Sequence, residues 1–262
     1  MFHVKHYKEV LMEKTNEFRR VVITGAGRGI GRTLALGFAG KSTEVVVHYA
    51  HSQQGARKVV DEIHARGGMA TMIQADLSDA EEVADFTKNI HDELGKIDVW
   101  INNAGASANS KETKRLNEIQ MFNRVMSLDV MGTWQCCRRV EPYMNDGGCI
   151  INIGWDGALY GLPGLTSQLY AMSKGAIMSL TRTLATEYAP RVHVNCIVPG
   201  WVENDWSRSL PESSQQRKVE RVPMKRWGTA EDVLGAALYL ASPAASYVTG
   251  QSILINGGEF MQ

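Results

Sequence analysis

The chain has 262 residues, in which 28 Lys and Arg balance 28 Asp and Glu, and 44% of the residues are hydrophobic. This length and apolar content suit one large domain with a substantial core. The even charge balance argues against a nucleic-acid-binding surface, and no apolar run approaches the roughly 18–20 residues that span a membrane.

The cysteines and the N-terminal residues carry no sign of export. The four cysteines form neither a CxxC pair nor a His/Cys cluster, so we expect no metal site and buried, reduced thiols in a cytoplasmic protein. Residues 1–19 lack the apolar core of a signal peptide and are interpreted as an extension, either frayed or packed on a neighbouring subunit. Residues 20–262 are then expected to form a single domain.

A glycine-rich turn between a strand and a helix is the first functional signal. The β-branched run Arg20–Thr24 ends at Gly25, and glycines recur to Gly31 before a helical pattern that includes Leu34 and Phe38. Backbone N–H groups at such a helix start bind phosphate when no side chain stands in the way. The turn therefore predicts nucleotide binding.

The end of the second expected strand bears on the choice of cofactor. The strand reads Val45–Tyr49, and the residues at its end, His48 to Ser52, include no carboxylate that would bind ribose hydroxyls and repel a 2′-phosphate. Arg28, His48, His51 and Ser52 could contact that phosphate, which favours NADP(H), with NAD(H) as the alternative. The two histidines could equally be ordinary surface residues.

The remaining pattern alternates strands with helices. Strands are expected at 70–75, 97–101, 149–153, 192–198 and 250–255, and helices at 53–66, 124–145, 170–188 and 231–241. This alternation predicts a doubly wound parallel sheet, a Rossmann fold, with helices on both faces. Residues 106–123 and 201–222 are mixed in character, and the second stretch is interpreted as a mobile lid.

Tyr170 and Lys174 are the residues most suited to chemistry. At a spacing of four they lie one turn apart on the same helix face. Other polar signals stand where strands end: Asp76 after the third strand, and Asn102 to Gly105 after the fourth. Asp76 could also be a simple capping residue.

These motifs together resemble the short-chain dehydrogenase/reductase family, from about Arg20 to the end of the chain. The resemblance is closest to 3-oxoacyl-carrier-protein reductase-like members. It rests on Thr24-Gly25-x-x-x-Gly29-Ile30-Gly31, Asp76, Asn102-Asn103-Ala104-Gly105, Tyr170-x-x-x-Lys174, Pro199-Gly200 and Val248-Thr249-Gly250. It implies an enzyme that assembles as a homotetramer, or a homodimer, and acts on a small carbonyl or alcohol substrate.

The resemblance also implies roles for individual residues. Tyr170 would exchange a proton with the substrate oxygen, and the Lys174 ammonium would lower the pKa of a phenol that otherwise titrates near pH ~10. The cofactor would be bound by residues from each motif: Gly25, Arg28, Gly29, Ile30, Gly31, His48, Asp76, Leu77, Asn103, Gly105, Tyr170, Lys174, Pro199, Gly200 and Val202.

Two positions depart from the family pattern. Where the family has a serine that donates to the substrate oxygen, this chain has Trp155, and the connection to Tyr170 is two residues longer. The indole N–H of Trp155, a protonated Asp156 or Ser167 could take the role. Asp129 stands where the family has an asparagine, and its charge would offset part of the help that Lys174 gives Tyr170.

Two functions follow from this balance. The intact Tyr170–Lys174 pair favours an NADP(H)-dependent oxidoreductase acting on carbonyls or secondary alcohols. The missing serine and the charge of Asp129 leave the alternative of a nucleotide-binding protein with little or no turnover, acting as a sensor or partner subunit.

Overall fold

The computed structural model describes residues 19–106 and 113–261, and its central feature is a seven-stranded parallel sheet in the order β3-β2-β1-β4-β5-β6-β7. The order runs outward from β1 to β3 and then returns to β4, so the direction of winding switches between β1 and β4. This confirms the predicted doubly wound fold. The strands are β1 Arg19–Ile23, β2 Thr43–Tyr49, β3 Met69–Gln74, β4 Ile97–Asn102, β5 Met144–Ile153, β6 Val192–Pro199 and β7 Ser252–Ile255.

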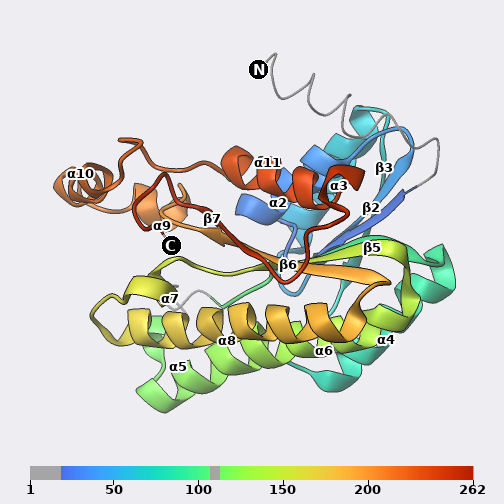
Figure 1. Ribbon diagram of the computed structural model, residues 1–262, viewed down its shortest axis with the longest axis horizontal. Helices are drawn as coiled ribbons and strands as arrows, with labels where there is room; N and C mark the ends of the chain where they lie inside the picture. Colours follow the sequence, from blue (N-terminus) through green and yellow to red (C-terminus); the bar gives the residue numbers. More distant parts are fainter. Residues whose placement is uncertain (1–18, 107–112, 262) are drawn as a thin grey trace.

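Helices cover both faces of the sheet (Figure 1). One face is covered by α2 Gly29–Phe38, α3 Gln53–Ala65 and α11 Ala230–Leu240. The other is covered by α4 Ala80–Leu94, α6 Thr133–Val140 and α8 Leu165–Tyr188, with α5 Glu118–Val125 joined to α6 through the π-helical segment η2 Met126–Gly132. The short helices are α7 Gly157–Tyr160, α9 Asp205–Arg208 and α10 Glu212–Arg221, with 3-10 turns at Thr113–Arg115, Glu141–Tyr143 and Pro243–Ala245.

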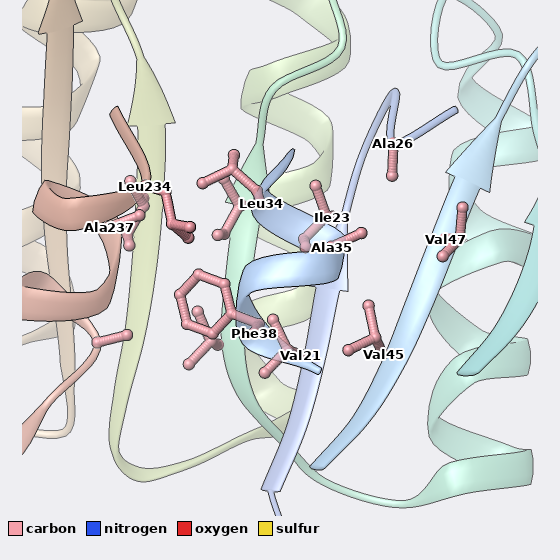
Figure 2. Close-up of a cluster of buried hydrophobic side chains, with 14 of the residues drawn as sticks. Val21, Ile23, Ala26, Leu34, Ala35, Phe38, Val45, Val47, Leu234 and Ala237 are labelled. Carbon is pink, nitrogen blue, oxygen red and sulfur yellow. The ribbon is translucent and has the colours of Figure 1, made fainter. Parts of the chain in front are cut away.

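The core that orients α2 lies between β1, β2 and α11 (Figure 2). Leu34 and Phe38 of α2 are fully buried against Val21 of β1 and against Leu234 of α11. A Cβ on Gly37 would lie 2.4 Å from the Leu234 side chain, so the two helices approach more closely than any larger residue would allow. This packing fixes the N-terminal end of α2 at the carboxyl edge of the sheet.

The fifth strand and the helix before it differ from the sequence prediction. The helix expected at 124–145 begins at Glu118, contains the π-helical segment, and ends at Val140, just before Pro142. Proline lacks the N–H that would continue the helix. Strand β5 begins at Met144 instead of Cys149, and its pairing with β4 shifts register near Ile97. The Asn145–Gly148 stretch has the composition of a turn, which hid the early start of the strand.

Three further predictions from the sequence concern residues 1–19, 106–123 and 201–222. The extension expected at 1–19 lies outside the described residues, apart from Arg19, which begins β1. Residues 107–112 also lie outside them, and residues 118–123 of the same stretch are helical. The expected lid at 201–222 contains α9 and α10, and its mobility stays a prediction. None of the described helices is long and apolar enough to cross a membrane.

Candidate active site

The turn between β1 and α2 presents backbone to a ligand. Gly25 and Gly29 have φ values of +63° and +54°, in the left-handed region that favours glycine. A Cβ on Gly31 would lie 2.4 Å from the Gly25 carbonyl oxygen. Arg28 at the N-cap makes no side-chain cap, so the first N–H groups of α2 are left for an anion. These features fit the diphosphate of a dinucleotide.

This turn is fastened to the turn that follows β4. The Asn103 side-chain amide donates to the carbonyl oxygens of Thr24 at 2.9 Å and Gly25 at 3.1 Å. The Thr24 hydroxyl accepts the backbone N–H groups of Asn103 at 3.0 Å and Ala104 at 2.9 Å. The two turns meet at the switch point of the sheet, so Asn103 shapes the nucleotide site through the glycine turn.

His48 does not lie where the sequence analysis placed it. Its side chain is only 1% exposed, Nδ1 accepts the Gly25 N–H at 3.0 Å, and Nε2 lies 3.0 Å from the Ala75 carbonyl oxygen. Burial lowers the pKa of His48 to about 4, so the ring is neutral and supports the glycine turn from behind. The prediction that His48 contacts a cofactor phosphate is wrong, because both ring nitrogens are occupied inside the fold.

The other residues predicted to contact a 2′-phosphate are on the surface at this edge of the sheet. His51, Ser52 and Arg28 are exposed at the carboxyl ends of β1 and β2. A Cβ on Gly55 would lie 2.7 Å from the Gly27 carbonyl oxygen, so the start of α3 packs directly against the glycine turn. The first turn of α3 holds no acidic residue.

Asp76 lies at the end of β3 and is held by its neighbours. Its Oδ1 accepts the backbone N–H and the hydroxyl of Ser78 at 2.9 and 2.7 Å. Burial alone would raise the pKa of Asp76, but these two bonds and the positive charges of His51 and Arg124 lower it. The adjacent Leu77 is buried, and its backbone faces Gly132 closely. Asp76 is thus a preformed, ionised acceptor at the nucleotide edge.

Tyr170 and Lys174 meet Asp129 beside that edge. Helix α8 places the Lys174 Nζ 5.3 Å from the centre of the Tyr170 ring and 3.4 Å from Asp129 Oδ2, and Lys174 and Asp129 are buried. Asp129 comes from the π-helical segment and also accepts the Ala106 N–H at 2.6 Å and the Ser173 hydroxyl at 3.2 Å. Sequence reasoning missed Ser173, although its place between Tyr170 and Lys174 was the available signal.

The charges around Tyr170 act against each other. Burial raises the pKa of the Tyr170 phenol, the Lys174 ammonium lowers it, and the Asp129 carboxylate raises it again, with a net upward shift. Burial would lower the pKa of Lys174, but Asp129 and Tyr170 outweigh it and raise it. Lys174 is therefore a charged ammonium at neutral pH, and Asp129 does offset part of its effect on Tyr170, as the sequence suggested.

Trp155 stands next to Tyr170, whereas Asp156 is directed elsewhere. The two aromatic rings of Trp155 and Tyr170 lie 5.2 Å apart with an interplanar angle of 55°. A Cβ on Gly157 would lie 2.3 Å from the indole, so the Trp155 side chain folds back over the start of α7. The fully buried Asp156 packs toward Gly200 and the end of the chain, and its charge is not among those that shift Tyr170. Ser167 lies in the first turn of α8.

The end of β6 closes the site on its far side. The Asp156 N–H donates to the Pro199 carbonyl oxygen at 3.1 Å, and the Gly200 N–H donates to Ile255 at 3.1 Å. Val202 is buried and bridges to Gly228, while Gly105 at the β4 turn is exposed and faces Asp129. The predicted residues other than His48 thus gather along the carboxyl edge of the sheet. Among the described residues, no three His, Cys, Asp or Glu side chains are grouped as a metal site.

Comparisons with known proteins match this architecture. A family model described as enoyl-(acyl carrier protein) reductase matches residues 25–259. The 3-oxoacyl-(acyl-carrier-protein) reductase of Staphylococcus epidermidis is 35% identical over 246 residues, which cover 93% of this chain and 99% of the relative. The 3beta-hydroxysteroid dehydrogenase 1 of Eggerthella lenta is also 35% identical, over 92% of this chain and 93% of the relative.

Solved structures of similar proteins share this fold. A dehydrogenase/reductase from Sinorhizobium meliloti superposes with a TM-score of 0.86 at 30% identity, covering 94% of this chain and 97% of that one. A blue fluorescent protein from a metagenomic library, in complex with NADPH, gives a TM-score of 0.84 at 29% identity, covering 94% and 99%. Sequence, fold and site together show that the chain belongs to the short-chain dehydrogenase/reductase family of oxidoreductases.

Proposed function

We propose that the protein transfers a hydride between NADP(H) and a carbonyl or secondary alcohol substrate, with Tyr170 as proton donor and acceptor. The observation that carries this proposal is the buried Lys174 ammonium beside the Tyr170 ring, at the same sheet edge as the glycine turn. The bound cofactor supplies or accepts the hydride. Tyr170 gives its phenolic proton to the oxygen of the carbonyl being reduced, or takes it back from an alcohol.

The other residues of the site support that proton transfer. Lys174 stabilises the phenolate that forms when Tyr170 loses its proton. Asp129 fixes the Lys174 ammonium between the β4 turn and α8, at the cost of a higher pKa for Tyr170. Trp155, which is in ring contact with Tyr170, donates its indole N–H to the substrate oxygen in place of a serine hydroxyl.

NADP(H) is the proposed cofactor because the 2′-phosphate side of the site has no acid. His51, Ser52 and Arg28 are exposed there, and the first turn of α3 has no carboxylate. Similar solved structures are described as complexes with NADPH and with NADP. Calorimetric titration should show tighter binding of NADPH than of NADH, and Arg28→Gln should narrow the difference. Tighter binding of NADH would overturn the assignment.

The proton-transfer role is tested with Tyr170→Phe. Removal of the hydroxyl should lower kcat for NADPH-dependent ketone reduction by roughly 10²–10⁴-fold, the usual contribution of a positioned acid, while NADPH still binds. Tyr247→Phe is the matched control, because that tyrosine is fully exposed. Unchanged turnover in Tyr170→Phe would exclude this proton donor. Tight NADPH binding without turnover of any carbonyl tested would instead favour a sensor or partner subunit.

The proposed donor has its own test. Trp155→Phe keeps an aromatic ring against Tyr170 but removes the indole N–H, and should lower kcat by roughly 10²–10³-fold, as expected for the loss of one such donor. The Km for NADPH should change little. If Trp155→Phe turns over at the wild-type rate while Ser167→Ala is slow, the donor is Ser167.

The effect of Asp129 is visible in the pH dependence of alcohol oxidation, which needs unprotonated Tyr170. Because the Asp129 charge raises the pKa of Tyr170, Asp129→Asn should move the midpoint of the rising rate to lower pH. A midpoint that stays in place or moves upward would contradict the assigned electrostatics. The measurement is kcat for oxidation of a secondary alcohol by NADP⁺ across the alkaline range.

Assembly and location complete the proposal. Resemblance to the family supports a homotetramer or homodimer, and exposed apolar side chains on α5, η2 and α6 supply a surface for it: Ile119, Phe122, Met131 and Trp134. Four free, buried cysteines support a cytoplasmic location. Light scattering of the purified chain tests the assembly.

A further inference from the structure

A group of buried oxygen atoms lies where α7, the segment after β7 and the end of α10 come together. It consists of the Asp156 and Glu259 carboxyls and the Tyr160 hydroxyl. The Asp156 residue is 0% exposed and the Glu259 side chain 2% exposed. Within the described part of the chain, none of these five oxygen atoms has a hydrogen-bond partner of ordinary geometry. Buried polar groups are nearly always partnered, and the Tyr160 hydroxyl offers one O–H to four carboxyl oxygen atoms, so a second proton on a carboxyl satisfies the group better.

The ion pairs around the group distinguish its two carboxyls. Arg221 at the end of α10 places Nε 3.3 Å from Glu259 Oε1, and Lys218 of the same helix also acts on Glu259. No Lys or Arg of the described residues forms an ion pair with Asp156. Asp156, the carboxyl without a cationic partner, is therefore the member that holds the proton.

The groups that face Asp156 agree with this assignment. They are Tyr160 from α7, Glu259 from the C-terminal segment, the uncharged amide of Asn256 and the backbone N–H groups of Asp156 and Gly157, while the end of β6 offers Pro199 and Gly200. Burial raises the pKa of Asp156 to about 6, the Glu259 charge adds to this, and the Asn256 amide and the two backbone N–H groups oppose it. The Asn256 amide lies near the carboxyl without meeting hydrogen-bond geometry.

Asp156 connects this group to the active site. It directly follows Trp155, its backbone N–H donates to the Pro199 carbonyl oxygen at 3.1 Å, and its carbonyl oxygen accepts the Leu159 N–H at 2.8 Å. Its Oδ2 lies where it would be 3.0 Å from a Cβ on Gly200. The backbone of Asp156 thus ties the turn that carries Trp155 to the end of β6, and its side chain packs against the backbone that follows β6.

We propose that Asp156 is a positioning residue: its neutral carboxyl, donating to the oxygen atoms of Tyr160 or Glu259, holds the Trp155 turn against Gly200, and its ionisation loosens that contact. The neutral form adds a second O–H donor to that of the Tyr160 hydroxyl. The ionised form removes that donor and places two carboxylates together, which favours separation of α7 from the C-terminal segment. The consequence for turnover rests on the proposed reductase function.

The first experiment measures kcat for ketone reduction between pH 5 and 8. Wild-type kcat should fall by roughly 10-fold as pH rises through the pKa of Asp156, since small displacements of positioning groups slow catalysis by that order or more. In Asp156→Asn, which cannot ionise, this step should disappear. In Glu259→Gln, which removes the charge that raises the pKa of Asp156, the step should move to lower pH. A step that persists unchanged in both variants overturns the proposal.

The second experiment needs no turnover. The emission of Trp155 is isolated as the difference between wild-type fluorescence and that of Trp155→Phe, and it should shift to longer wavelength as pH rises through the same range. The same difference taken in the Asp156→Asn background should stay constant. A constant Trp155 emission in wild type overturns the proposal whatever the enzyme reduces. A shift without reduction of any carbonyl supports it and removes only the reductase function.

Discussion

The buried polar groups next to the glycine turn and those next to the Trp155 turn differ in whether they have hydrogen-bond partners. At the glycine turn, the side chains of Thr24, His48 and Asn103 each make two or more hydrogen bonds to backbone. Behind Trp155, both carboxyls of the buried group lack hydrogen-bond partners in the described residues. The first region is complete before any ligand arrives, while the second depends on a proton.

This difference separates what the fold must keep constant from what it can adjust. A dinucleotide diphosphate needs a fixed set of backbone N–H groups, and a neutral His48 with both nitrogens bonded keeps them in place over the physiological pH range. The substrate side carries Trp155 and Asp129, the two positions at which the sequence is predicted to depart from the family pattern. The Asp129 charge there acts directly on the pKa of Tyr170.

The largest effect should come from breaking the rigid region with Gly31→Ala. The new Cβ would lie 2.4 Å from the Gly25 carbonyl oxygen and 2.5 Å from the Asn103 side-chain nitrogen, so the two turns must separate. A displacement of about 1 Å there should weaken NADPH binding by roughly 10²-fold or more. Calorimetry measures the affinity, and circular dichroism reports whether the fold persists.

Gly175→Ala is the control for that change, because a Cβ at this position of α8 would meet no atom of the described residues within 4 Å beyond the backbone of the helix itself. Replacing a glycine inside α8 should stabilise the protein by about 0.5–1 kcal/mol and leave NADPH binding intact. Wild-type affinity in Gly31→Ala would mean that the close approach of the turns is not required.

The next largest effect is the pH dependence that the Asp156 carboxyl gives to the free energy of unfolding. The folded pKa of Asp156, about 6, exceeds its ordinary 3.8, so the folded state binds the proton more tightly than the unfolded state. Stability is then unaffected below pH ~4, falls between pH ~4 and ~6, and stays lowered above. Asp156→Asn lacks this loss. Its free energy of unfolding relative to wild type should therefore rise by about 3 kcal/mol from pH 3.5 to 7, measured by urea unfolding.

Asp232 provides the opposite case on the same measurement. Its bidentate pair with Arg226 lowers the pKa of Asp232 to about 2, so its stabilisation is present above pH ~4 and lost as pH falls toward 2. Both side chains are partly exposed, and solvent screening should limit the contribution to about 1 kcal/mol or less. For Asp156, a free energy of unfolding of Asp156→Asn relative to wild type that falls as pH rises would contradict a protonated carboxyl in the folded protein.

Sequence reasoning located the rigid region well because its rules are local. Glycines after a strand and before a helix, and the spacing of Tyr170 and Lys174, follow directly from backbone geometry. It failed at His48, because β2 is buried from Val45 to Tyr49 and its apolar run gives no alternation to show which face the histidine takes.

The substrate side escaped prediction for a different reason. The buried group joins Asp156, which follows β5, to Glu259, which follows β7, and the two come together through the pairings of β5 with β6 and of β6 with β7. No local pattern marks such a contact, and the only signal was a charged residue inside an otherwise uncharged C-terminal segment. The early start of β5 was likewise hidden, since Asn145 to Gly148 have turn-like composition.

The smallest effect concerns α10, a helix in which no residue is buried and which lies to one side of the sheet (Figure 1). Besides Arg221, Lys218 attaches the helix: its Nζ lies 3.3 Å from the ring centre of Trp201 and 5.6 Å from that of Trp206. Burial lowers the pKa of Lys218. Cation–π contacts of this kind contribute ~0.5–2 kcal/mol. Lys218→Gln should therefore loosen the helix and raise the substrate Km by about 2–10-fold, because this segment follows Pro199-Gly200 at the substrate side.

Arg217→Gln tests whether that effect belongs to the aromatic contact or to charge on the helix in general. The Arg217 guanidinium donates to the Ser214 hydroxyl within α10, so its loss removes one positive charge without touching Trp201. We expect the Arg217 variant to keep the wild-type Km and both variants to keep the wild-type affinity for NADPH, because the glycine turn is fastened independently of α10. Equal Km increases in the two variants would show that the helix contributes through its net charge. An NADPH affinity that falls with Lys218→Gln would show that the substrate side and the nucleotide side are coupled, and the contrast between the two regions would then be one of degree.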